Sequence, residues 1–79
     1  MGKTKRVAPR KLARKLRQVR TRVGMSQTEI AKALGVKDRA SISQFESGKR
    51  EPHLLVLLKY ARLAKVSMET LVDDKAKLP

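Results

Sequence analysis

The chain contains no cysteine and no tryptophan, and it has only one phenylalanine and one tyrosine. The lack of cysteine excludes disulfide bonds, thiolate metal sites and a cysteine nucleophile. With so few aromatic residues, the core has to consist mainly of aliphatic side chains. The single histidine, His53, cannot form a histidine-based metal site by itself, so we expect no metal ion and no other cofactor. The 79 residues predict one small domain.

Acidic residues are scarce, and long apolar runs are absent. Seven Asp and Glu residues accompany twenty Lys and Arg residues, which gives a net charge of +13. Half of the basic residues lie between Lys3 and Arg22, and no acid precedes Glu29. Such a segment favours binding to a polyanion, although charge alone does not separate DNA from RNA or anionic lipid. No apolar run approaches the roughly 20 residues of a membrane span, and no apolar segment follows the basic start as in a signal peptide. We therefore expect a cytoplasmic protein.

Apolar spacing and capping residues predict five helices and an all-α fold. The first helix is expected from Pro9 to just before Gly24. The others lie between Ser26 and Gly35, between Asp38 and Gly48, from Leu54 to Ala64, and after Ser67. Residues 1–8 are expected to form a flexible basic arm, residues 9–73 the domain, and residues 74–79 a loose polar tail.

The second and third predicted helices carry the most specific pattern. Ser26 and Glu29 form a capping box at the start of the second helix. On the third helix, Ile42 and Phe45 share an inner face. The opposite face collects residues that are mostly short and polar, namely Arg39, Ala40, Ser43, Gln44 and Ser47. Two short helices joined at a glycine turn, the second with one such face, are typical of a DNA-binding helix-turn-helix.

The fourth predicted helix is apolar nearly all round, which indicates either deep burial or a partner. Its inner face is expected to hold Leu54, Leu57, Leu58, Ala61 and Ala64. A domain of this size offers little depth, so we expect the remaining apolar side chains to form a homodimer face. These are Leu55, Val56, Tyr60 and Leu63.

Residues from Leu16 to about Val72 resemble the Cro/lambda-repressor-like (XRE-type) helix-turn-helix family, a compact five-helix DNA-binding domain. The resemblance rests on a set of short segments that are weak singly and specific together. These are Val19-Arg20, Gly24-Met25-Ser26-Gln27, Ile30-Ala31, Leu34-Gly35-Val36, Ile42-Ser43-Gln44-Phe45-Glu46, Gly48-Lys49 and Pro52.

The resemblance implies a division of roles. It assigns base contacts to Arg39, Ala40, Ser43 and Gln44. It assigns phosphate contacts to Gln27, Ser47 and Lys49, and we add Ser26 and Arg50, which lie beside them. It also implies a structural ion pair between Arg20 and Glu46, with Arg20 as a free phosphate contact as the alternative. The basic arm, with Lys3, Lys5 and Arg6, is expected either to contact the duplex or to remain unengaged.

The residue types suit these roles. Gln can make two hydrogen bonds to adenine N6 and N7, and Arg can make two to guanine O6 and N7. Gln44 could also be an ordinary exposed residue, and Arg39 could instead contact a phosphate or pair with Asp38. We find no catalytic arrangement of residues and expect no enzyme.

The sequence thus predicts a dimeric, sequence-specific regulator that binds double-stranded DNA, acts as a repressor, and belongs to a prokaryote or a phage. An antitoxin with a toxin partner, or a restriction–modification controller protein, would use the same domain. A basic RNA-binding or nucleoid-coating protein without sequence preference is another alternative, as is a protein-interaction module that uses the apolar fourth helix.

Overall fold

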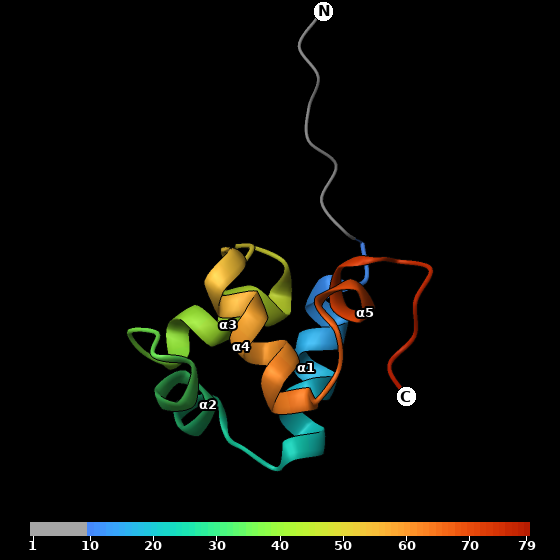
Figure 1. The fold of residues 1–79 in the computed structure, drawn as a ribbon. Coiled ribbons are helices and arrows are strands. Elements are labelled where there is room, and N and C mark those ends of the chain that lie inside the picture. Colours follow the sequence, from blue (N-terminus) through green and yellow to red (C-terminus); the bar gives the residue numbers. More distant parts are fainter. Residues whose placement is uncertain (1–9) are drawn as a thin grey trace, which may run out of the picture.

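A computed structural model describes residues 10–79, which fold into five helices (Figure 1). They are α1 (Leu12–Val23), α2 (Gln27–Leu34), α3 (Arg39–Ser47), α4 (Leu54–Ala64) and α5 (Met68–Val72). The described part of the chain contains no strand, and the predicted all-α architecture is confirmed. None of these helices is long and apolar enough to cross a bilayer.

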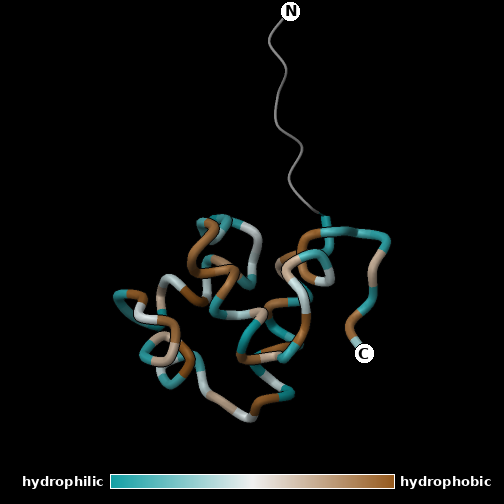
Figure 2. Tube along the Cα trace, in the orientation of Figure 1, coloured by the Kyte–Doolittle hydropathy of each residue, from teal (hydrophilic) through white to brown (hydrophobic). Residues whose placement is uncertain are grey.

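The helices are arranged around α4. In Figure 1, α2 and α3 lie on one side of α4, and α5 lies on the other side. Helix α1 runs across the bundle and contacts α3, α4 and α5. Hydrophobic and hydrophilic residues are interspersed along most of the chain, as an apolar stripe on a surface helix requires, whereas α4 is hydrophobic over most of its length (Figure 2).

Side-chain caps begin three of the helices as the sequence predicts. Ser26 Oγ accepts a hydrogen bond from Glu29 N at 3.0 Å, and Glu29 Oε1 accepts one from Ser26 N at 2.8 Å, which completes the capping box. Asp38 caps α3 and Ser67 caps α5. Hydrogen bonds from the backbone and hydroxyl of Ser26 lower the pKa of Glu29, so this carboxylate stays charged at the positive end of α2.

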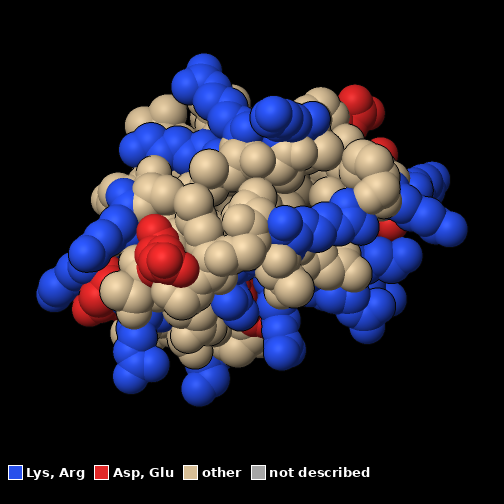
Figure 3. All heavy atoms as spheres, turned by 90° about the horizontal axis from the view of Figure 1, so that it is seen from below, with Lys and Arg blue, Asp and Glu red and all other residues tan. Residues whose placement is uncertain are grey.

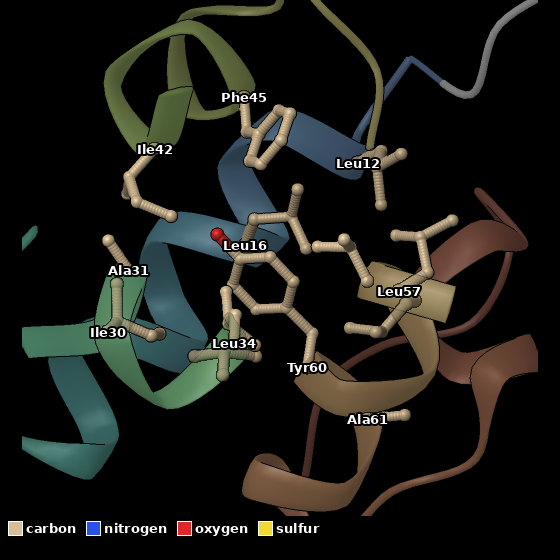
Figure 4. Packing of buried hydrophobic residues seen from close by; sticks show 13 residues of the cluster. Leu12, Leu16, Ile30, Ala31, Leu34, Ile42, Phe45, Leu57, Tyr60 and Ala61 are labelled. Atoms are coloured by element: carbon tan, nitrogen blue, oxygen red, sulfur yellow. The ribbon is translucent and has the colours of Figure 1, made fainter. Parts of the chain in front are cut away.

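The core is aliphatic except for two rings, Phe45 and Tyr60. Tyr60 reaches from α4 into the centre, where it lies near Leu16 and Leu34 (Figure 4). The ring is fully buried, and its hydroxyl has no hydrogen-bond partner among the described residues. Burial raises the pKa of Tyr60, with a smaller contribution from the nearby Glu46 carboxylate, so the phenol remains neutral.

The rotation of α4 differs from the sequence-based expectation. Val56 and Tyr60, assigned to the dimer face, are buried at 7% and 0% exposure. Leu54, assigned to the inner face, is 68% exposed, whereas Leu57 and Ala61 are buried as expected. A helix that is apolar on every side has no polar face to fix its orientation, so its packing against α1, α2 and α5 decides which side is buried.

The start of α1 is also later than predicted. Pro9 lies outside the described residues, and the helix begins at Leu12 after Lys11. The side chain that satisfies the backbone there comes from the other end of the chain. Asp74 accepts hydrogen bonds from the N–H groups of Arg10 and Lys11 at 2.9 and 3.0 Å. These bonds, led by that from Lys11, lower the pKa of Asp74.

Lys15 fastens the C-terminal segment, residues 73–79, to α1. Its side chain is buried, and Nζ donates to the carbonyl oxygens of Thr70, Asp73 and Ala76 at 2.7, 2.8 and 2.8 Å. Leu78 packs against the core, and Arg22 donates to the carbonyl of Pro79. Residues 74–79, expected to form a loose polar tail, therefore pack against the rest of the domain. The charged group of Lys15 makes its hydrogen bonds inside the protein.

We predict that Lys15→Met destabilises the domain by about 2–4 kcal/mol. A hydrogen bond to a charged group contributes about 1.5–3 kcal/mol. In the variant, three carbonyls lose the hydrogen bond from Lys15, and water can replace only some of these bonds. Methionine keeps most of the length of the side chain, so the loss reports the ammonium group. Chemical denaturation measures the change. Lys75→Met, at an exposed position, is the matched control, and equal stability of the two variants would contradict the prediction.

Candidate nucleic-acid interface

The exposed face of α3 consists of the residues that the sequence assigns to base contacts. Ser41, Ile42 and Phe45 point inward and are buried. The remaining side chains of the helix are exposed, apart from the partly buried Glu46; they are Arg39, Ala40, Ser43, Gln44 and Ser47. The inner face packs against α1 and α2, so the outer face is left free for a ligand.

A shallow hollow of about 350 Å³ brings this face together with the start of α2. It is lined by Gln27, Arg39, Ala40, Ser43 and Gln44. The four predicted base-contacting residues and the predicted phosphate-contacting glutamine therefore lie side by side, although Gln27 is separated from them in sequence.

An ion pair fixes the angle between α1 and α3. Arg20 Nε donates to Glu46 Oε2 at 2.6 Å, and Arg20 Nη2 donates to Glu46 Oε1 at 3.1 Å. The side chains are 19% and 7% exposed, respectively. The hydrogen bond that Arg20 donates to Glu46 raises the pKa of Arg20, so the guanidinium stays charged. The structure thus forms the pair that the family resemblance implies.

The same pair also organises the start of α2. Arg20 Nη1 donates to the carbonyl of Met25 at 3.1 Å, and Gln27 Nε2 donates to Glu46 Oε1 at 3.3 Å. Ser26, a predicted phosphate contact, uses its oxygen to cap α2 and is exposed. The start of α2 is a positive helix end, where backbone N–H groups favour an anion, and its Gln27 lines the hollow.

The end of α3 and the turn after it carry the other predicted phosphate contacts. Ser47, Lys49 and Arg50 are exposed there. Gly48 has φ of 81°, a left-handed conformation that glycine adopts without strain and that turns the chain back toward α3. A second hollow of about 470 Å³ lies between this turn and the start of α1, and Arg10 lines it with Lys49 and Arg50.

In the sequence, Arg10 is one of several residues of a basic segment, and nothing there connects it with the turn after α3. The signal was non-local, because Arg10 and Lys49 are brought together by the packing of α1 on α3. Exposed arginines continue along α1, where Arg14, Arg17 and Arg22 line a further hollow of about 280 Å³. Figure 3 shows Lys and Arg atoms projecting around the outline of the molecule, with acidic atoms in a few small groups.

Two sets of predicted residues are not placed at this interface. Lys3, Lys5 and Arg6 of the basic arm lie outside the described residues. The residues of the proposed dimer face lie on α4 and do not form one surface, because Val56 and Tyr60 are buried, Leu63 is partly buried, and Leu55 is 63% exposed. Within residues 10–79, no group of three His, Asp or Glu side chains is placed to hold a metal ion.

The geometry agrees with comparisons to known proteins. The family model described as helix-turn-helix matches residues 16–71. The antitoxin HipB of Escherichia coli is 36% identical over 72 residues, which are 91% of this chain and 74% of that protein. An uncharacterised HTH-type transcriptional regulator of Archaeoglobus fulgidus is 39% identical over 63 residues, which are 77% of this chain and 89% of that protein.

Solved structures show the same arrangement of helices. The P22 c2 repressor protein in complex with a synthetic operator has a TM-score of 0.73 at 25% identity, over 81% of this chain and 96% of that one. The restriction–modification controller protein C.AhdI from Aeromonas hydrophila has a TM-score of 0.67 at 33% identity, over 77% and 91% of the two chains.

We predict that Glu46→Ala loosens the domain rather than only weakening its ligand binding. The substitution leaves Arg20 without its partner, and breaking a buried pair typically costs about 3–5 kcal/mol. Since Arg20 is 19% exposed, water can offset part of this, and we expect a loss of about 2–4 kcal/mol. Thermal and chemical unfolding measure it, with Glu69→Ala at an exposed position of α5 as the control. An unchanged melting temperature together with lost DNA binding would contradict a structural role.

Proposed function

The chain belongs to the helix-turn-helix family of DNA-binding transcription regulators, and we propose that it inserts α3 into the major groove as a sequence-specific repressor. The single observation that supports this most directly is the hollow that Gln27 forms with the exposed face of α3. A second helix of a helix-turn-helix enters the groove with such a face and contacts base edges. Occlusion of a promoter by the bound protein would repress transcription.

We assign the base contacts to Arg39, Ala40, Ser43 and Gln44. Arg39 lies in the first turn of α3, where side chains extend beyond the helix end, and it can donate two hydrogen bonds to guanine. Ser43 can donate to or accept from either kind of base pair, and the Ala40 methyl group can contact a thymine methyl. Gln44 has an amide that can discriminate between base edges.

We assign the phosphate contacts to the two edges of this face. Ser26 and Gln27 lie at the start of α2, and Ser47, Lys49 and Arg50 lie in and after the last turn of α3. Bonds on both sides would fix the orientation of α3 in the groove without reading sequence. Lys3, Lys5 and Arg6 of the arm would add further phosphate contacts.

A homodimer remains part of the proposal, with a smaller contact face than the sequence predicts. Leu54 and Leu55 at the start of α4 are 68% and 63% exposed, and they are the most exposed large hydrophobic residues of the described chain. We propose that these two side chains, which follow the turn after α3, pack against a second copy. Two copies would then contact half-sites about one helical turn apart.

Two other functions use the same DNA contacts. The similarity to the antitoxin HipB favours an antitoxin that also binds a toxin, and the similarity to C.AhdI favours a restriction–modification controller. The neighbouring gene discriminates between them, since a toxin gene indicates the first and a restriction–modification system indicates the second. A non-specific RNA-binding or nucleoid-coating role would instead give equal affinity for random and selected nucleic acids.

We predict that selection from a random duplex library yields a defined site, and that variants separate base contacts from phosphate contacts. Gln44→Ala should reduce the discrimination between bases at one base pair per half-site by about 1–3 kcal/mol.

Lys49→Ala should weaken binding to all sequences alike and lower the slope of log affinity against log salt by about 0.9. Deletion of residues 1–8 should lower that slope by about 0.9 for each phosphate the arm contacts. Equal binding to random duplex, single strand and selected DNA would refute sequence-specific recognition.

We predict that Leu55→Lys produces a folded monomer. The side chain is exposed, so its replacement should leave the melting temperature nearly unchanged, whereas a lysine at a contact between two copies would place two ammonium groups close together. Sedimentation velocity over a range of concentrations measures the change, and footprinting shows whether one or two half-sites are protected. Val72→Lys, at 36% exposure on α5, is the control. A wild-type protein that stays monomeric at every concentration would rule out the dimer.

A further inference from the structure

Arg50 is tied to Gln44, the residue of α3 that we expect to discriminate best between bases. Arg50 Nη1 donates to Gln44 Oε1 at 3.1 Å, and Arg50 N donates to the carbonyl of Gln44 at 3.2 Å. The guanidinium of Arg50 also lies over the ring of Phe45, with its carbon 5.2 Å from the ring centre. Three separate contacts therefore hold Arg50 beside one side chain of the interface.

These contacts have different physical origins and support one another. The backbone bond follows from the left-handed turn at Gly48, which returns the chain to α3. A hydrogen bond from a charged donor is stronger than one between neutral groups. The face of an aromatic ring attracts a cation, and Phe45 is itself fixed in the core at 2% exposure. The position of Arg50 is therefore set before any DNA binds.

The hydrogen bond decides which way the Gln44 amide is turned. A guanidinium has only donors, so the amide atom that faces it has to be the oxygen. The amide nitrogen, Nε2, lies on the other branch of the same plane and has no hydrogen-bond partner among residues 10–79. Gln44 thus offers two N–H donors, while Arg50 occupies one of the two lone pairs of its oxygen and holds that oxygen on the side of the following turn.

We propose that Arg50 determines specificity by presenting Gln44 to the base edge as a donor. In the major groove, guanine offers two acceptors, N7 and O6, whereas adenine offers the acceptor N7 beside the donor N6. A glutamine with a free amide pairs with both atoms of adenine, but one whose oxygen is held by Arg50 is matched to guanine. The same residue of α3 therefore prefers a different base because of its neighbour in the following turn.

This inference rests on the proposed function and competes with one assignment made above. As a phosphate contact, Arg50 would add affinity for every sequence and would not change which base is preferred. As a positioning residue, it changes the preference at the base pair that Gln44 contacts. The two roles therefore differ in an outcome that binding experiments measure directly.

The test is a comparison of selected sites for the full chain and three variants. Gln44→Ala identifies the base pair that Gln44 contacts, because the base preference at that position should become weaker in this variant. At that position the wild-type protein should prefer guanine to adenine by roughly 5- to 150-fold, the range for one good pair of hydrogen bonds. Arg50→Met keeps an aliphatic stem over Phe45 and removes the donors, and it should shift the preference toward adenine by roughly tenfold.

Lys49→Ala is the matched control, because Lys49 lies on the same turn and its side chain makes no hydrogen bond to Gln44. It should weaken all sites equally and leave the base preference as it is. The inference is overturned if Arg50→Met lowers affinity uniformly, if the wild type prefers adenine at the Gln44 position, or if Gln44→Ala relaxes no position. Failure of the wild type to select any site would instead refute the proposed function, and melting temperatures exclude unfolding as the cause.

Discussion

The ion pair between Arg20 and Glu46 is the interaction on which the proposed DNA-binding face depends. It joins α1 to α3, and through Met25 and Gln27 it also holds the start of α2. The proposed phosphate contacts and the exposed face of α3 keep their spacing only while these three helices keep their angles. A small core gives limited resistance to helix rotation. Directional bonds between charged groups supply an orientation that aliphatic packing alone does not specify.

The large positive charge of the chain divides into a structural part and a part left for DNA. Lys15 donates hydrogen bonds to three backbone carbonyls, and Arg20 pairs with a carboxylate. Neither side chain therefore contributes fully to the electrostatic field outside the protein. Lys15 does what a disulfide often does in a small protein, since it fastens a terminal segment to the first helix. Asp74 completes this closure from the other side by accepting two N–H groups ahead of α1. The count of Lys and Arg residues thus overstates the number of basic side chains available to a partner.

Local signals in the sequence were sufficient for most of the fold. The capping box of Ser26 and Glu29, the Asp38 cap and the outer face of α3 each depend on residues a few positions apart, and all were predicted correctly. The rotation of α4 and the docking of residues 73–79 were not predictable, because their partners are distant in sequence. Tyr60 is the largest fully buried side chain of the described residues, and a helix with apolar residues on nearly every side gives no local sign of this. At the interface, the sequence alone does not show that Gln27 lies close to α3, because this closeness results from the packing of α2 on α3. The base-contact assignments are proposals.

The hydrogen bond between Gln44 and Arg50 shows why residue types on α3 do not by themselves specify a DNA sequence. A glutamine has both a donor and an acceptor, so its preference depends on which of them the protein leaves free. That depends here on the turn that follows the helix, whose course is set by Gly48 and whose cation is steadied by the buried Phe45 ring. In the proposed complex, recognition therefore involves the exposed face of α3 and also the Phe45 ring in the core beneath it. Because the Arg20–Glu46 pair fixes the same helix from its other side, the orientation of α3 and the orientation of one of its side chains are controlled by separate arginines.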